Sequence, residues 1–256
     1  MRISDILYEK ANKAARRFGR GFKIPFDEFA GRIDGVPPTE RRLTPMHEAF
    51  YGNSDAVVHK WRHYLTIYDR HLSRFRNTPV RLLEIGVFKG GSLLMWRRYF
   101  GERATIFGID IDENCAAYDG KGGRVRIGSQ ADPEFLKRVV DEMGGIDVVI
   151  DDGSHVAMHQ RASFNALFPA LDARGLYICE DVHSAYWRGY FGGGYQRSTS
   201  FIEFCKQIVD DLHSDFHGRG ESVTGASRSI SGVHFYNSMV VIEKEPQRPP
   251  MHIKVP

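Results

Sequence analysis

The chain has 256 residues, of which 42% are hydrophobic and 26% are charged, and its formal net charge is +3. This length is enough to bury one α/β core with an appendage, and the small net charge does not indicate nucleic-acid binding. No apolar run is long enough to span a membrane, and the N-terminus lacks the apolar region of a signal peptide. The three cysteines are far apart, so we expect a cytoplasmic protein with reduced thiols.

Residues 1–79 are expected to form a helical but interrupted N-terminal cap, because four prolines break its early part. A long helix is expected from about Ser54 to Arg76. Residues 1–23 contain seven Lys or Arg and two acids. A solvated helix face is the favoured interpretation of this basic segment, and docking on a membrane surface or a sister subunit is the alternative.

Residues 80–110 have the pattern of a strand, a glycine turn, a helix and a second strand that ends in an acid, which is half of a nucleotide-binding unit. The turn places Glu84, Gly86 and Gly90 in the order E-x-G-x-x-x-G, which differs from both the dinucleotide and the P-loop patterns. Asp110 ends the second strand, where its carboxylate can accept hydrogen bonds from both hydroxyls of a ribose. A tight turn without a ligand is the alternative interpretation.

The rest of the chain continues the alternation of strands and helices. Strands are expected at 124–127, 146–150 and 175–179, and helices at 132–143, about 158–171 and 200–213. Two final strands, Gly232–Tyr236 and Met239–Glu243, are expected to form a hairpin. This order predicts an α/β fold with a doubly wound, Rossmann-like sheet.

Acidic side chains follow two of the expected strands, as Asp151-Asp152 and as Glu180-Asp181. Because the carboxyl ends of parallel strands share one edge, Asp152, Glu180 and Asp181 can converge there. Three adjacent carboxylates repel one another unless a cation neutralises them. Oxygen ligands at this position favour Mg²⁺, with Mn²⁺ or Ca²⁺ as alternatives and zinc disfavoured. The competing interpretation is that Asp151 and Asp181 cap the helices that follow.

These motifs carry a resemblance to known enzymes. The E-x-G-x-x-x-G turn resembles motif I of class I S-adenosylmethionine-dependent methyltransferases. The pair D-D-G-S-H and E-D resembles the metal-dependent bacterial sugar O-methyltransferases that act on macrolide deoxysugars, or on rhamnose or mannose residues of glycolipids and polysaccharides. The resemblance covers about residues 46–243. It implies a seven-stranded methyltransferase sheet, with residues 80–256 as the S-adenosylmethionine-binding catalytic domain.

The resemblance also implies roles for individual residues. Glu84, Gly86, Gly90 and Asp110 are expected to bind S-adenosylmethionine, Ser129 and Gln130 its adenine, and Asp152, Glu180 and Asp181 a Mg²⁺ ion. His155 is expected to be the general base, with His159 and His183 as rivals. Further candidates for lining the acceptor pocket are the aromatic and glycine-rich loop 182–197 and, in the cap, His47, Tyr51 and Trp61.

The expected reaction is methylation of a sugar hydroxyl in an oligosaccharide, a polysaccharide precursor, a glycolipid or a glycosylated natural product. A homo-oligomer is expected from the same resemblance. Two alternatives stay open from the sequence, a catechol-type O-methyltransferase and a non-catalytic module that binds the cofactor.

Overall fold

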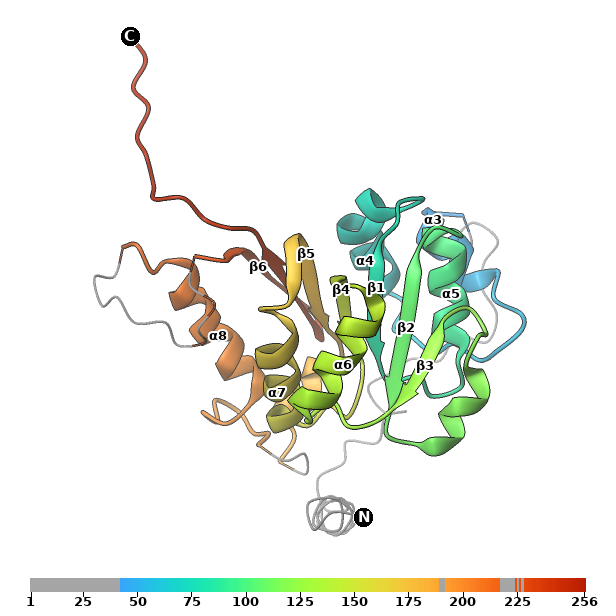
Figure 1. The fold of residues 1–256 in the computed structure, drawn as a ribbon. Coiled ribbons are helices and arrows are strands. Elements are labelled where there is room, and N and C mark those ends of the chain that lie inside the picture. The colour runs from blue at the N-terminus through green and yellow to red at the C-terminus, as the bar shows by residue number, and fades with distance from the viewer. Residues whose placement is uncertain (1–41, 189–191, 217–223, 225, 227) are drawn as a thin grey trace.

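The computed structural model describes residues 42–188, 192–216, 224, 226 and 228–256. Within them one sheet has the strand order β3-β2-β1-β4-β5-β7-β6 (Figure 1). Its strands are β1 (Arg81–Ile85), β2 (Thr105–Asp110), β3 (Arg124–Ile127), β4 (Ile146–Asp151), β5 (Leu171–Cys179), β6 (Ile230–Tyr236) and β7 (Met239–Lys244). The strand order reverses between β1 and β4, and ligands of doubly wound sheets bind at such a switch point.

The C-terminal strands form the expected hairpin. β1 to β5 pair in parallel, whereas β7 runs antiparallel to both β5 and β6 and lies between them. Asn237 and Ser238 connect the two strands, and Ser238 has a φ of +65°, in the left-handed region. The prediction of a doubly wound, seven-stranded sheet with an antiparallel hairpin is therefore confirmed.

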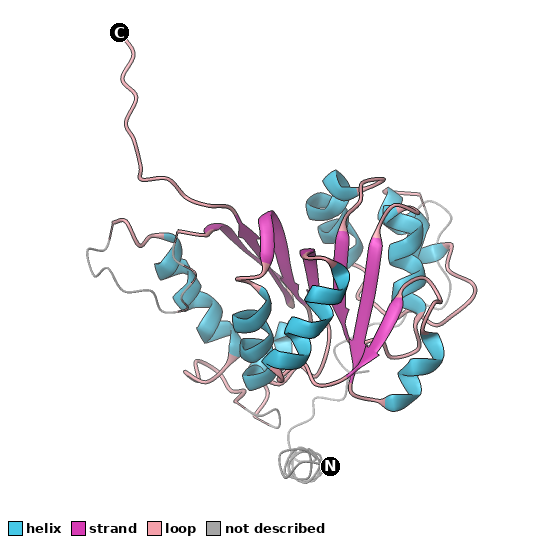
Figure 2. Cartoon of the chain, viewed as in Figure 1, coloured by secondary structure: helices cyan, strands magenta, loops and turns pink. Residues whose placement is uncertain are grey.

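Helices cover both faces of the sheet (Figure 2). One hydrophobic cluster joins the sheet to α6 (Pro133–Met143), α7 (Ala157–Leu167) and α8 (Phe201–Leu212). A second cluster joins the other face to α3 (Pro45–Tyr51), α4 (Tyr64–Leu72) and α5 (Gly91–Phe100). Short 3₁₀ segments are η2 (Ser73–Phe75), η3 (Glu113–Tyr118) and η4 (Val182–Tyr186). The apolar run in β4 is explained by this arrangement, because its side chains are buried alternately in the two clusters.

The N-terminal region differs from the expectation. Residues 1–41, with the basic segment, lie outside the described residues. Residues 42–79 pack into the same cluster as the sheet through α3 and α4. The predicted long helix from Ser54 is wrong, because the helix begins only at Tyr64. The preceding segment instead passes over the start of α5, where a Cβ on Gly91 would lie 2.2 Å from the Val57 carbonyl oxygen. Asn53 Nδ2 donates to the Gly91 carbonyl at 3.2 Å and holds this path.

Two other element boundaries differ from the prediction. The helix predicted to reach residue 171 ends at Leu167, and β5 begins at Leu171 instead of residue 175. Leu171 pairs with Ile146 before a shift in register, so pairing with β4 draws the earlier residues into the strand. Beyond β7, residues 245–256 leave the sheet without a helix or strand (Figure 1).

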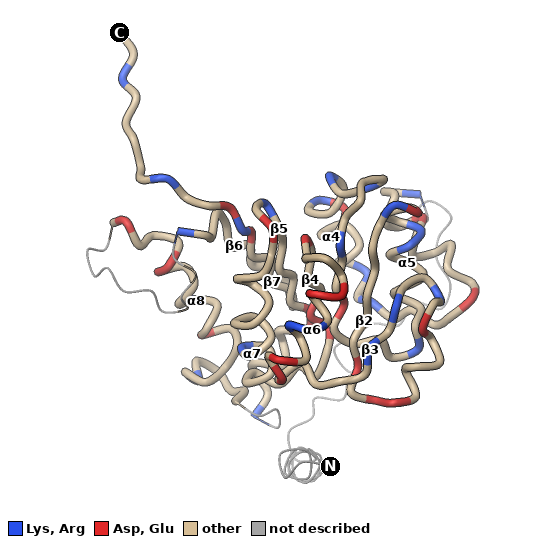
Figure 3. Tube along the Cα trace, in the orientation of Figure 1, with Lys and Arg blue, Asp and Glu red and all other residues tan. Residues whose placement is uncertain are grey.

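Basic and acidic residues alternate along the described part of the chain, as the blue and red segments of the trace show (Figure 3). No described helix has both the length and the apolar character needed to cross a membrane.

Candidate active site

The carboxyl ends of β1, β2, β4 and β5 meet at one edge of the sheet. The Asp152 amide donates to the Ile85 carbonyl at 3.0 Å, and the Glu180 amide donates to the Asp151 carbonyl at 2.9 Å. Gly86 turns the chain away from this edge with a φ of +98°, and a Cβ there would lie 2.2 Å from the Asp152 carbonyl oxygen. Only glycine fits this combination of backbone conformation and close approach.

This contact yields a prediction for Gly86→Ala. Gly120 has a similar φ of +80° but open space around it, so Gly120→Ala is a matched control for the backbone strain alone. We expect Gly86→Ala to lower the free energy of unfolding by at least about 1 kcal/mol more than the control, because only it adds a steric clash. Urea denaturation measures both. Equal losses would show that the turn yields to the extra methyl group.

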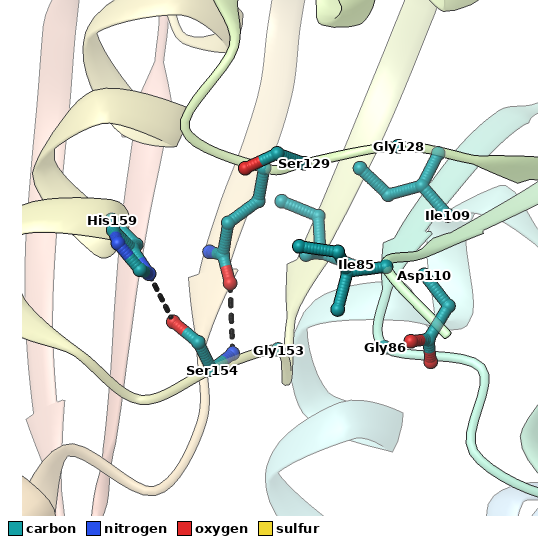
Figure 4. Close-up of a pocket in the computed structure, with 11 residues that line it drawn as sticks. Ile85, Gly86, Ile109, Asp110, Gly128, Ser129, Gly153, Ser154 and His159 are labelled. Atoms are coloured by element: carbon teal, nitrogen blue, oxygen red, sulfur yellow. Dashed lines mark hydrogen bonds between the residues drawn. The ribbon is translucent and has the colours of Figure 1, made fainter. Parts of the chain in front are cut away.

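A pocket lies at this edge, between the ends of β1, β2 and β4 (Figure 4). Its lining comprises Ile85, Gly86, Ile109, Asp110, Ile111, Gly128, Ser129, Gln130, Gly153, Ser154 and His159. Four of the six predicted cofactor-binding residues are in this lining: Gly86, Asp110, Ser129 and Gln130.

Asp110 orders the glycine turn at the mouth of the pocket. Its Oδ2 accepts hydrogen bonds from the backbone amides of Val87 at 2.9 Å and Phe88 at 3.1 Å, and its Oδ1 accepts from the Asp112 amide at 3.0 Å. A carboxylate oxygen has two lone pairs, so Oδ1, which accepts one hydrogen bond here, retains acceptor capacity for a ligand hydroxyl.

Gln130 links the pocket to the buried floor of the sheet. Its Oε1 accepts from the Ser154 amide at 2.8 Å, and its Nε2 donates to Asp151 Oδ1 at 3.1 Å. The Asp151 carboxylate is fully buried and also accepts from Ser163 and Tyr177, so it supports the loop and does not cap α7.

Glu84 and Gly90 are not in the pocket lining. The Glu84 side chain is fully buried beneath α5, where it accepts from Ser92 Oγ at 2.6 Å and Trp96 Nε1 at 2.9 Å. Gly90 has a φ of +71° and precedes α5, and a Cβ there would lie 2.7 Å from the Tyr118 ring. In this structure both residues shape the turn, and neither lines this pocket.

The three predicted metal ligands lie close together beside the pocket, but their carboxylates face different groups. Asp152, Asp181 and His155 each offer a ligand atom within 4.8 Å of the others. His155 Nε2 lies 3.9 Å from both Asp152 Oδ1 and Asp181 Oδ2. Glu180, which is 1% exposed, is instead turned inward. Oxygen donors from Asp152 and Asp181 fit a hard divalent cation at this cluster.

Lys60 is the partner of Glu180, and the sequence analysis did not identify it. Its Nζ donates to Asp152 Oδ2 at 2.6 Å and to both Glu180 oxygens at 2.9 Å, and lies 3.8 Å from Glu84 Oε1. The side chain is only 3% exposed. Burial alone lowers the pKa of the Lys60 ammonium, but Asp152, Glu180 and Glu84 together raise it above its ordinary value. A permanent cation therefore neutralises one side of the acidic cluster.

Asp181 is fixed by the segment that carries Lys60. Its Oδ1 accepts from Trp61 Nε1 at 3.0 Å and from the Tyr64 hydroxyl at 2.8 Å, and its backbone has a φ of +53°. Its side chain makes no capping hydrogen bond to η4, so the capping alternative is wrong for Asp181 as well. Oδ2 is left pointing toward His155.

His155 and its rivals have different surroundings. His155 has a φ of +55°, its carbonyl accepts from Ser184 Oγ at 3.1 Å, and its buried Nδ1 has no hydrogen-bond partner among the described residues. His159 lines the pocket and pairs with Ser154 Oγ at 2.9 Å, and burial lowers its pKa. His183 pairs with Ser238 Oγ, and its Nδ1 lies 4.0 Å from Asp181. Of these three histidines, only His155 lies within 4.0 Å of both Asp152 and Asp181.

The predicted acceptor-pocket residues are scattered. Tyr186 and Tyr195 are 48% and 77% exposed, while residues 189–191 of the same loop lie outside the described residues. His47 on α3 is buried, and its Nδ1 pairs at 2.9 Å with Oγ1 of Thr44, the residue that precedes the helix. Trp61 donates a hydrogen bond to Asp181 and also contacts the ring of His183.

Known proteins match this part of the chain. A family model described as a methyltransferase domain matches residues 83–182, which run from β1 into η4 and contain the pocket and the acidic cluster. This part of the chain is a methyltransferase domain. The glycine turn, the switch-point pocket and the acids after β4 and β5 all belong to that domain.

The relatives of this methyltransferase domain include a tetracenomycin rhamnosyl 3'-O-methyltransferase of Streptomyces olivaceus, 40% identical over 195 residues, which are 72% of this chain and 50% of the relative. L-olivosyl-oleandolide 3-O-methyltransferase of Streptomyces antibioticus is 39% identical over 67% of this chain and 47% of its own length. The chain thus spans about half the length of the curated relatives it matches.

A solved structure agrees in fold. It is MycE methyltransferase from the mycinamycin biosynthetic pathway, in complex with Mg, SAH and mycinamycin VI. It is 36% identical to this chain with a TM-score of 0.70, over 80% of this chain and 54% of MycE.

Proposed function

We propose that this chain is an S-adenosylmethionine- and Mg²⁺-dependent O-methyltransferase that methylates a sugar hydroxyl of a glycosylated small molecule, with His155 as the general base. The observation that carries the proposal is the cluster of Asp152, His155 and Asp181 directly beside the switch-point pocket. The names of the curated relatives, which are methyltransferases of sugar-bearing natural products, support the acceptor class. Polysaccharide precursors and glycolipids stay predictions from the sequence.

S-adenosylmethionine would occupy the pocket, with Asp110 near its ribose and Ser129 and Gln130 on the adenine side. Asp152 and Asp181 would hold Mg²⁺, and Glu180 is the third candidate ligand, in exchange for its bonds to Lys60. When bound, S-adenosylmethionine supplies an electrophilic methyl group, and Mg²⁺ supplies a charge that makes a hydroxyl easier to deprotonate.

The residues of the chain account for the movement of the proton. A sugar hydroxyl must lose its proton to become a good nucleophile, and His155 Nε2 would accept that proton. Asp152 Oδ1 and Asp181 Oδ2, each 3.9 Å away, stabilise the imidazolium that results. Trp61 and Tyr64 hold Asp181 in place, so one of these carboxylates is fixed before the acceptor binds.

The test is transfer of a labelled methyl group from S-adenosylmethionine to rhamnosides, other deoxysugar glycosides, mannosides and catechols, with Mg²⁺ or EDTA. We expect transfer to a glycoside in Mg²⁺ alone. Transfer to catechols would favour the aromatic alternative, and cofactor binding without transfer to any acceptor would favour a binding role. Sedimentation of the same protein tests the expected homo-oligomer.

Asp152→Asn tests the metal role separately from turnover. Because one carboxylate ligand is lost, we expect Mg²⁺ affinity to fall at least tenfold by calorimetry. Asp141→Asn, at an exposed position on α6, is the matched control and should bind Mg²⁺ as the wild type does. Unchanged Mg²⁺ affinity in Asp152→Asn would remove Asp152 from the metal site.

A further inference from the structure

A second cluster of metal-binding side chains lies away from the proposed active site. His71 near the end of α4, His234 on β6 and Glu243 on β7 each offer a ligand atom within 4.8 Å of the others. Glu243 is three residues along β7 from Val240, which pairs with Cys179 at the active-site end of β5. At about 3.3 Å per residue, it lies about 10 Å farther from that edge.

The sheet register turns these donors toward one point. Val241 packs in the same cluster as α4, and Glu243, two residues farther along β7, faces the same side of the sheet. Because His234 pairs with Val241, its side chain lies on that side as well. Gly232 pairs with Glu243 and has no side chain that would occupy the space beside the cluster. A Cβ on Gly232 would lie 3.2 Å from both Glu243 Oε2 and His234 Nε2, so a larger residue would press on the cluster.

Two distances between the donors are longer than ordinary hydrogen bonds and close to the edges of a metal polyhedron. His234 Nε2 lies 3.3 Å from Glu243 Oε1, and His71 Nδ1 lies 3.6 Å from the same oxygen. Hydrogen-bonded N and O atoms are usually about 2.7–3.2 Å apart. A tetrahedral zinc with bonds of about 2.0–2.1 Å places neighbouring ligand atoms about 3.3–3.4 Å apart.

The hydrogen bonding around the cluster also fits a ligand role. His234 Nε2 is buried and has no hydrogen-bond partner among the described residues. His71 Nε2 is 2.8 Å from the Tyr236 hydroxyl, which orients the ring so that Nδ1 faces Glu243. Histidine ligands of metals commonly have such a partner on the second nitrogen.

We infer that His71, His234 and Glu243 form a Zn²⁺ site that joins α4 to the β6–β7 hairpin. Two imidazoles and one carboxylate are a zinc donor set, whereas Mg²⁺ prefers oxygen ligands. The side chains of His234 and Glu243 are 40% and 31% exposed, so the cluster lies close to the surface of the protein. α4 carries Tyr64, whose hydroxyl oxygen lies 2.8 Å from both Asp181 Oδ1 and the Ser238 carbonyl oxygen, so the ion would stiffen the support of the active site.

Titration of tag-free protein with ZnCl₂ in excess Mg²⁺, followed by calorimetry, tests this site while Mg²⁺ competes at the acidic cluster. We expect one Zn²⁺ per chain, with affinity at least tenfold weaker in His234→Asn and in Glu243→Gln. His252→Asn and Glu245→Gln, both exposed in the C-terminal extension, are the matched controls and should bind as the wild type does. His71→Asn is not relied on, because His71 is buried and its loss can unfold the protein.

Two further measurements separate a ligand role from a structural one. Co²⁺ in place of Zn²⁺ should give visible absorption typical of tetrahedral nitrogen and oxygen ligation in the wild type and not in His234→Asn. Zn²⁺ should raise the Tm of the wild type and leave that of His234→Asn unchanged. Zinc binding of equal strength in His234→Asn and Glu243→Gln, or no zinc binding by the wild type in Mg²⁺, would overturn the proposal.

Discussion

Lys60→Met is expected to lower the free energy of unfolding by about 3–5 kcal/mol when Mg²⁺ is absent. The Lys60 ammonium bonds to Asp152 and to both oxygens of Glu180, and the side chains of Lys60 and Glu180 are 3% and 1% exposed. Removing this cation leaves the buried carboxylate of Glu180 close to that of Asp152 with no positive charge between them. Such an uncompensated charge costs more than the lost hydrogen bonds alone.

Urea denaturation in EDTA measures this effect. Lys137→Met is the control, because Lys137 is exposed on α6 and pairs only with Asp141 across one helical turn. Its loss should change stability by less than about 0.5 kcal/mol. Mg²⁺ should restore part of the stability of Lys60→Met, since a bound cation neutralises the same acids. A loss in Lys60→Met no larger than that in Lys137→Met would mean that these carboxylates are not charged in the folded protein.

A double substitution isolates the pair. Glu180→Gln in the Lys60→Met background removes the orphaned charge. The loss of stability in the double variant should therefore be clearly smaller than the sum of the losses in the two single variants. The same variants report on the metal. Without the competing ammonium, we expect Lys60→Met to bind Mg²⁺ more tightly than the wild type. Weaker Mg²⁺ binding would instead mean that Lys60 holds the carboxylates in the geometry that the ion needs.

His155→Asn is expected to lower kcat about 10²–10⁴-fold, the usual contribution of a general base. Asparagine suits this position, because it tolerates the φ of +55° that His155 adopts. The stability and the affinity for S-adenosylmethionine should stay close to the wild type, because the imidazole makes no hydrogen bond through Nδ1 and does not line the pocket. Single-turnover methyl transfer separates the chemical step from binding.

Chemical rescue distinguishes a base from a structural residue. His155→Gly keeps the positive φ without strain and leaves space for added imidazole, which should restore part of the transfer rate. His159→Asn is the comparison, since His159 lines the pocket and pairs with Ser154. We expect it to weaken cofactor binding more than it lowers kcat. A full loss of kcat in His159→Asn with a mild effect in His155→Asn would move the base to His159.

The sequence by itself determined the order of strands and helices and the edge at which the chemistry lies. Hydrophobic periodicity and the glycine turn are local signals, and acids that directly follow parallel strands reach the same edge whatever the loops do. For that reason Gly86, Asp110, Asp152 and Asp181 could be placed before any coordinates were known.

Only the tertiary structure decided which groups those acids face. Lys60 reaches Glu180 across 120 residues of sequence, and a lone lysine in an irregular segment carries no periodic signal. Glu84 belongs to the same turn as Gly86, but Ser92 and Trp96 on α5 draw its carboxylate inward. Contacts also override local propensity in the segment before Tyr64, where packing against Gly91 prevents the helix that the residues favour. Charge pairing in a buried site depends on distances between distant segments, and these exist only once the chain has folded.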